Sequence, residues 1–132
     1  MKIIDSDLSK EIPVPDKYVK GTVTVKIFED QPEVGLHISE VYFNAGSHTH
    51  WHIHPSTQIL TGKSGTGFVQ KKGEEPIKIK PGEMVIIYAG EVHWHGAGKN
   101  ESFVHTAIQV ADDEGTVIHP LTEAEYNQIN VL

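Results

Sequence analysis

The stretch Trp51-His52-Ile53-His54-Pro55-Ser56-Thr57-Gln58 holds two histidines one residue apart and an amide side chain four residues after the second. Alternate residues of a β-strand point to the same face, so His52 and His54 can aim two imidazoles at one point. Pro55 lacks the N–H that a strand ladder needs and therefore predicts a break in the strand. A turn after this proline would return Gln58 to the same point from the next strand.

A second histidine pair lies downstream, in Gly90-Glu91-Val92-His93-Trp94-His95-Gly96. Seven of the nine histidines fall between His48 and His105. Imidazole nitrogen binds zinc, copper, iron, nickel and manganese, and an amide oxygen favours the harder ions. A structural, hydrogen-bonded role would be the better interpretation of a lone histidine, but seven in one region favour metal binding. The sequence therefore predicts a single metal centre that joins the two stretches.

The spacing leaves open which histidines bind the metal. His48, His50, His52 and His54 all share one parity, and same-face neighbours on a strand lie about 6.5–7 Å apart. His48 and His54 are three such steps apart and cannot share an ion, whereas two neighbours can. Parity alone does not choose the pair.

Composition excludes several other classes of protein. The chain has 132 residues with a formal net charge of −7, and its lysines are scattered, so we expect no nucleic-acid partner. No apolar run is long enough to cross a bilayer, and the first twenty residues do not resemble a signal peptide. The absence of cysteine excludes disulfides and thiolate ligands. We expect a cytoplasmic protein without a membrane partner.

The remaining pattern predicts many short strands, and therefore an all-β sandwich or a closed antiparallel barrel. Two regions that contain prolines differ from this pattern. For residues 1–20 we expect an arm that can supply one edge strand. The tail carries a capping box, Thr122 to Glu125, that predicts a short helix. Gly62, Gly65 and Gly67 are spaced for a tight turn. We expect alternating or apolar strands at residues 21–28, 36–43, 58–61, 67–70, 77–80, 84–88 (buried) and 103–110.

The first histidine stretch resembles the first motif of the cupin superfamily, Gly, His-x-His, Glu and Gly at fixed spacing. Here these positions are Gly46, His52, His54, Gln58 and Gly65, with glutamine where most members have glutamate. This resemblance implies a single cupin domain of the jelly-roll β-barrel type over 1–132, with an arm at 1–20, a barrel at 21–110 and a tail at 111–132. It also implies a homodimer or larger homo-oligomer.

The second cupin motif is matched by Gly82, Tyr88, Gly90, His93 and Ala97, where Tyr88 replaces the usual proline and Ala97 the usual asparagine. The two motifs together imply that His52, His54, Gln58 and His93 are the metal ligands.

Several segments are similar to the bacterial manganese-dependent cupin hydroxynitrile lyases. They are Gly21 to Val23, Trp51 to Gln58, His93 to Ala97 and His105 to Gln109. The resemblance implies manganese, with iron, nickel or zinc as alternatives, and a small organic substrate. It also implies that His105 transfers a proton. His48 and His50 depart from the pattern of the group, and we expect them at the pocket mouth or on the surface.

Strand parity indicates which residues surround the ion. His95 shares parity with His93 and should therefore face the same site. We expect it either to orient a metal ligand or to contact the substrate. Both His95 and His105 are thus candidate catalytic residues. The interior faces of a small barrel predict a substrate pocket that includes Ser39, Val41, Phe43, Leu60 and Gln109.

Ligand charge favours one type of chemistry. Four neutral ligands leave the full +2 charge on the ion, whereas a glutamate would cancel one unit. The more positive centre is the stronger Lewis acid and stabilises the reduced ion, which works against oxygen activation. We therefore expect a lyase in preference to a quercetinase-type dioxygenase, with a non-catalytic binding module as a third alternative.

Overall fold

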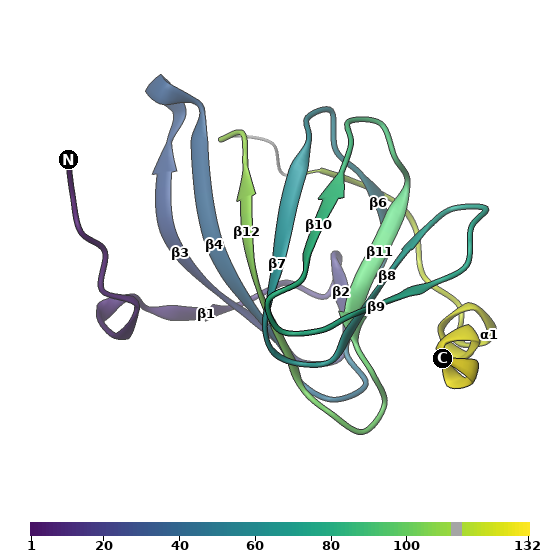
Figure 1. The fold of residues 1–132 in the computed structure, drawn as a ribbon. Coiled ribbons are helices and arrows are strands. Elements are labelled where there is room, and N and C mark those ends of the chain that lie inside the picture. Colours follow the sequence, from purple (N-terminus) through teal and green to yellow (C-terminus); the bar gives the residue numbers. More distant parts are fainter. Residues whose placement is uncertain (112–114) are drawn as a thin grey trace.

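The computed structural model describes residues 1–111 and 115–132, which form mainly antiparallel strands in two facing sheets (Figure 1). Three residues of the expected tail, 112–114, lie outside the described residues. The predicted all-β fold with a short C-terminal helix is confirmed.

The first sheet has six strands. In spatial order they are β1 (Glu11–Pro13), β3 (Val23–Gln31), β4 (Leu36–Phe43), β12 (Phe103–Gln109), β7 (Gln58–Gly65) and β10 (Met84–Ile87).

The second sheet has seven strands. Five lie in the order β13 (Thr116–His119), β6 (Trp51–Ile53), β11 (His93–Ala97), β5 (His48–Thr49) and β2 (Val19–Lys20); β8 (Gly67–Lys71) pairs with β11, and β9 (Ile77–Ile79) with β8. The helical segments are η1 (Ser6–Leu8), η2 (Pro32–Val34), α1 (Glu123–Tyr126) and η3 (Asn127–Val131).

Two hydrophobic clusters hold the strands together. One gathers inward side chains of both sheets around Phe43, Leu60 and Phe103, each at most 1% exposed. The other packs Trp51 and Trp94 against the C-terminal helical segment through Tyr126. Burying one such side chain contributes about 1.5–3 kcal/mol, so these clusters fix where the strands between them lie.

The N-terminal arm belongs to both sheets. Its strand β1 pairs with β3 at the edge of the first sheet, and β2 pairs with β5 in the second. The segment between them therefore crosses from one sheet to the other (Figure 1). One edge strand was expected in this arm, and the second strand follows because Val19 is buried at 3% exposure.

The expected tight turn at Gly62–Gly67 is wrong. β7 continues to Gly65 in the first sheet, and β8 starts at Gly67 in the second, so the chain changes sheets here and does not form a hairpin. Gly65 has a φ of +70°, which a glycine adopts without strain. A Cβ at this position would also collide with the carbonyl oxygen of Ser102.

The expected buried strand at residues 84–88 is also wrong. β10 is an edge strand whose Met84 and Ile86 are 63% and 48% exposed. Only its other face packs inward, with Ile87 in the core. The run of apolar residues at 84–88 therefore belongs to a strand that is buried on one face only.

The C-terminal segment closes one side of the second sheet. Thr122 and Glu125 form the predicted capping box, since each side chain accepts a hydrogen bond from the backbone N–H of the other. Tyr126 donates a 2.7 Å hydrogen bond to the carbonyl of Ala97 in β11. No helix in the described part of the chain is long and apolar enough to span a membrane.

Candidate metal centre

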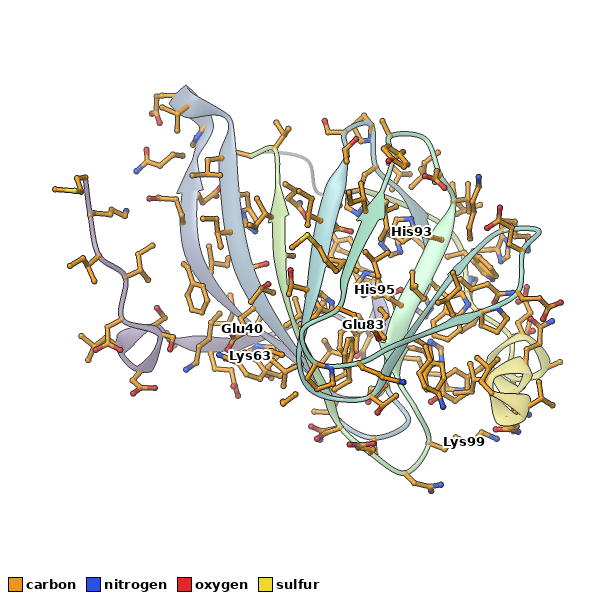
Figure 2. All side chains as sticks on the ribbon, viewed as in Figure 1. Glu40, Lys63, Glu83, His93, His95 and Lys99 are labelled. Carbon is orange, nitrogen blue, oxygen red and sulfur yellow. The ribbon has the colours of Figure 1, made fainter. Side chains whose placement is uncertain are left out.

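Strand pairing brings the two histidine stretches together. His52 in β6 lies directly opposite His93 in the antiparallel neighbour β11, and their ring centroids are 4.2 Å apart. His95 shares the face of His93, and both point between the sheets (Figure 2). One ring nitrogen from each of the three histidines lies within 4.8 Å of those of the other two. These three residues form a group that could hold a metal ion.

Backbone carbonyls fix the tautomers of two of these rings. His52 Nδ1 lies 2.8 Å from the carbonyl of His50, and His93 Nδ1 lies 2.8 Å from that of Glu91. A carbonyl oxygen only accepts, so each Nδ1 carries the proton and each Nε2 keeps a lone pair. His93 Nε2 is buried without a hydrogen-bond partner among the described residues. Buried lone pairs of this kind are suited to a metal ion.

Two further predicted ligands are His54, which is not one of the three grouped histidines, and Gln58. The ring of His54 is 5.1 Å from that of His52 and 5.7 Å from that of His93, and it is as close to both as the ring of His95. Gln58, at the start of β7, has a buried Oε1 that accepts no hydrogen bond from any described residue. The donor set of imidazole nitrogens and one amide oxygen fits a divalent ion.

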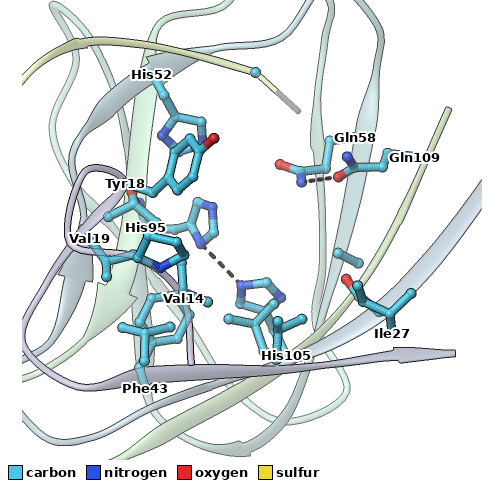
Figure 3. Close-up of a pocket in the computed structure, with 18 of the residues that line it drawn as sticks. Val14, Tyr18, Val19, Ile27, Phe43, His52, Gln58, His95, His105 and Gln109 are labelled. Atoms are coloured by element: carbon cyan, nitrogen blue, oxygen red, sulfur yellow. Dashed lines mark hydrogen bonds between the residues drawn. The ribbon is translucent and has the colours of Figure 1, made fainter. Parts of the chain in front are cut away.

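His95 and His105 form a hydrogen-bonded pair beside this cluster (Figure 3). His105 Nδ1 lies 3.1 Å from the carbonyl of Thr106 and must be its protonated nitrogen. His105 Nε2 therefore accepts from His95 Nδ1, 3.1 Å away. The proton on Nδ1 leaves His95 Nε2 with a lone pair, as in His52 and His93.

Burial keeps the rings of four of these histidines neutral, namely His52, His93, His95 and His105. Removal from water lowers the pKa of His52 to about 3 and the pKa values of His93 and His105 to about 4. The same cause lowers the pKa of His95 well below its usual range. The neutral rings of His52, His93 and His95 keep an Nε2 lone pair at neutral pH, and such a lone pair can bind a cation.

A cavity of about 430 Å³ opens beside the histidines, and most of its lining is aliphatic or aromatic. Four of the residues expected in the substrate pocket line it, namely Ser39, Val41, Phe43 and Gln109. Leu60 is fully buried in the core and is not among the lining residues. His52, His54, Gln58, His95 and His105 line the same cavity, so it connects the candidate ligands with the candidate catalytic pair.

The flanking histidines lie elsewhere. His48 is 3% exposed, stacks on Tyr126 at 4.6 Å and has its Nδ1 2.9 Å from the carbonyl of Thr49. It is neither at the pocket mouth nor on the surface, because Gly96 allows β5 to approach β11 closely. The side chain of His50 is bound through Nε2 to the carbonyl of Asp16 in the N-terminal arm.

Sequence reasoning missed the part of the cavity that the N-terminal arm supplies. Val14 and Tyr18 line the cavity together with His52, and Figure 3 labels all three. The only sequence signal was Val14 between Pro13 and Pro15, with Tyr18 shortly after them, in an otherwise charged arm. Asp30 and His37, which face each other at 3.3 Å, line the cavity as well.

An antiparallel barrel with a histidine cluster inside it, built on two glycine-spaced histidine motifs, is the arrangement that defines cupins. The cupin domain family matches residues 39–108. A curated (R)-mandelonitrile lyase from Granulicella tundricola is 33% identical over 117 residues, covering 86% of this chain and 89% of that protein. The chain belongs to the cupin family.

Solved structures agree with this assignment. A cupin-like protein from Thermotoga maritima has a TM-score of 0.85 and 32% identity, covering 94% of this chain and 96% of that one. The polyketide cyclase RemF from Streptomyces resistomycificus has a TM-score of 0.79 at 18% identity, covering 96% and 91%, and shows the fold alone.

Proposed function

We propose that this protein is a metal-dependent lyase that cleaves and forms cyanohydrins. The observation that carries the proposal is the cavity that His52, His54 and Gln58 line together with the hydrogen-bonded His95–His105 pair. The 33% identity to a mandelonitrile lyase supports the same reaction class.

The proposed ligands are His52, His54, Gln58 and His93, and the proposed ion is manganese. The ring distances and the buried Oε1 of Gln58 support this set, although His52, His93 and His95 also form a compact group. An ion held there would supply Lewis acidity, which lowers the pKa of a substrate hydroxyl. Leaving His95 out of the set keeps its Nε2 free for substrate.

The His95–His105 pair is proposed to move the proton. His95 Nε2 takes the hydroxyl proton, the C–C bond breaks toward the nitrile carbon, and cyanide then takes that proton and leaves as hydrogen cyanide beside an aldehyde. While His95 is charged, its Nδ1–H donates to His105 Nε2 and stabilises the imidazolium. The sequence suggested His105 as the base; the hydrogen bond supports a role for His105 through His95.

The cavity walls are proposed to hold the organic part of the substrate. Val41 and Phe43 from β4 and Tyr18 from the arm offer an apolar surface next to the polar centre. Such walls bind an aromatic or aliphatic aldehyde portion and exclude water from the proton-transfer pair.

Turnover of mandelonitrile tests the proposal. At equal manganese occupancy, the protein should release benzaldehyde without oxygen uptake. His95→Ala and His105→Ala should each lower the rate about 10²–10⁴-fold while retaining the metal, as expected for loss of acid–base catalysis. His119→Ala, outside the cavity, is the control and should retain the rate. No cleavage by the fully loaded wild-type protein would refute the lyase, and metal loss in His95→Ala would favour the alternative ligand set.

A homo-oligomer of one-domain chains is part of the proposal. Ile86, Ile59, Ile108 and Ile38 follow one another in register across the outer face of the first sheet. Ile86 and Ile108 are 48% and 41% exposed, and such an apolar row is typical of an interface. Light scattering should give a mass of at least two chains.

A further inference from the structure

The amide of Gln58 has two orientations that differ by a half turn. One presents Oε1 to the histidine cluster, and the other presents the NH₂ group, which cannot bind a cation. A ligand role therefore requires that something select the orientation. Glutamate, the residue common at this position in related cupins, has two equivalent oxygens and no such requirement.

Gln109 faces the other side of this amide. Gln58 Nε2 donates a 2.6 Å hydrogen bond to Gln109 Oε1 (Figure 3). The contact joins β7 and β12, which are paired next to it through Ile59 and Ile108. Because the NH₂ group is turned to Gln109, the Oε1 of Gln58 is turned away from it. That oxygen is buried and accepts no hydrogen bond from the part of the chain that the structure describes.

We infer that Gln109 is a positioning residue, which accepts the N–H of Gln58 and so keeps the Gln58 oxygen available to a metal ion. The inference rests on the proposed metal site but not on the proposed reaction. It gives Gln109 a task that differs from the substrate contact expected for a pocket residue. Residues that orient a metal ligand typically contribute about 10–100-fold in metal affinity.

Substitution of Gln109 tests this directly through the dissociation constant of Mn²⁺, measured without substrate by the loss of the free-ion electron paramagnetic resonance signal. Gln109→Met removes the acceptor at similar size and should weaken binding about 10–100-fold. Gln109→Glu only accepts, so it should bind the ion at least as tightly as the wild type. Thermal unfolding of the metal-free variants checks that each is folded.

A second background separates orientation from general packing. In Gln58→Glu the ligand no longer has a wrong orientation, so Gln109→Met should then change affinity less than threefold. A packing role would give the same change in both backgrounds.

The outcomes distinguish the inference from the metal site itself. Wild-type protein that binds no Mn²⁺ would refute the metal site. If the wild type and Gln109→Met bind Mn²⁺ with equal dissociation constants, the positioning role is refuted and the metal site stands. The same holds if Gln109→Met changes the dissociation constant equally in both backgrounds. Weaker Mn²⁺ binding in Gln109→Met that disappears in the Gln58→Glu background would support both.

Discussion

At the scale of single residues, the candidate centre depends on where each histidine proton is held. The carbonyls of His50 and Glu91 hold the Nδ1 protons of His52 and His93, and both rings thereby keep an Nε2 lone pair. The backbone two residues before each histidine thus prepares the ring for a cation without adding a charged group. Metal-binding histidines commonly have such a partner.

Gln58→Glu tests the role of ligand charge. The carboxylate cancels one unit of the charge of a divalent ion, so we expect Mn²⁺ affinity to be retained or increased and the Lewis acidity to fall. Cyanohydrin turnover at equal metal occupancy should therefore decrease, and oxidation of the ion should become easier. A variant with unchanged turnover and unchanged redox potential would show that Gln58 is not a ligand.

The sequence predicted part of this centre. Parity alone placed His93 and His95 on one face, and the pairing of β6 with β11 brought His52 opposite His93. The bonds from His95 to His105 and from Gln58 to Gln109 join different strands, so they depend on register and rotamer, which no local pattern encodes. Sequence spacing also could not separate His48 from the cluster.

At the scale of elements, the histidine strand β11 is held by pieces from distant parts of the chain. It pairs with β5, β6 and β8, and the hydroxyl of Tyr126 binds the carbonyl of Ala97 at its end. Glu125 accepts a hydrogen bond from the indole of Trp51 in β6 and forms an ion pair with Lys72. The short helix α1 therefore fastens the strands that carry the site.

Capping of α1 predicts a measurable contribution to stability. Thr122→Ala removes the side chain that accepts from the Glu125 N–H, and we expect a loss of about 0.5–2 kcal/mol in the free energy of unfolding. Thr122→Ser keeps the acceptor and is the matched control, which should remain within about 0.5 kcal/mol of the wild type. Urea unfolding followed by tryptophan fluorescence measures both. Equal losses in the two variants would contradict the capping role.

The strand pattern was easier to predict than its connections. Alternating residues located β4 and β12 well, and in β12 one face, with Phe103, His105 and Ala107, is buried against the core. The change of sheet after Gly65 and the arm that joins both sheets were not predicted, since either is decided by packing between segments far apart in sequence. Edge position also exposed one face of β10, although its composition is that of a core strand.

At the scale of the whole molecule, burial of neutral histidines links stability to pH. Burial lowers the pKa values of five of them, namely His48, His52, His93, His95 and His105. In the unfolded chain these groups take up protons near pH 6.5, whereas the folded chain resists protonation. The unfolded state therefore binds more protons below pH 6.5, and acid favours unfolding.

The metal-free protein should thus lose stability as pH falls from about 6.5 toward 5. Each proton taken up on unfolding contributes about 1.4 kcal/mol per pH unit. The lowered pKa values of Glu40 and Glu125 act in the same direction but only below their ordinary pKa of 4.5, outside this window. Urea midpoints in chelator at pH 7.5 and 5.5 measure the effect. Equal midpoints would contradict the burial of neutral histidines.

The central claim is that the histidine cluster binds one divalent ion per chain, and a titration of metal-free protein with Mn²⁺ tests it most directly. The account predicts one tightly bound ion for the wild type and for His48→Ala, whose ring lies outside the cluster. His52→Ala and His93→Ala should lose most of the binding. Binding that survives both of these changes but disappears in His48→Ala would contradict the account.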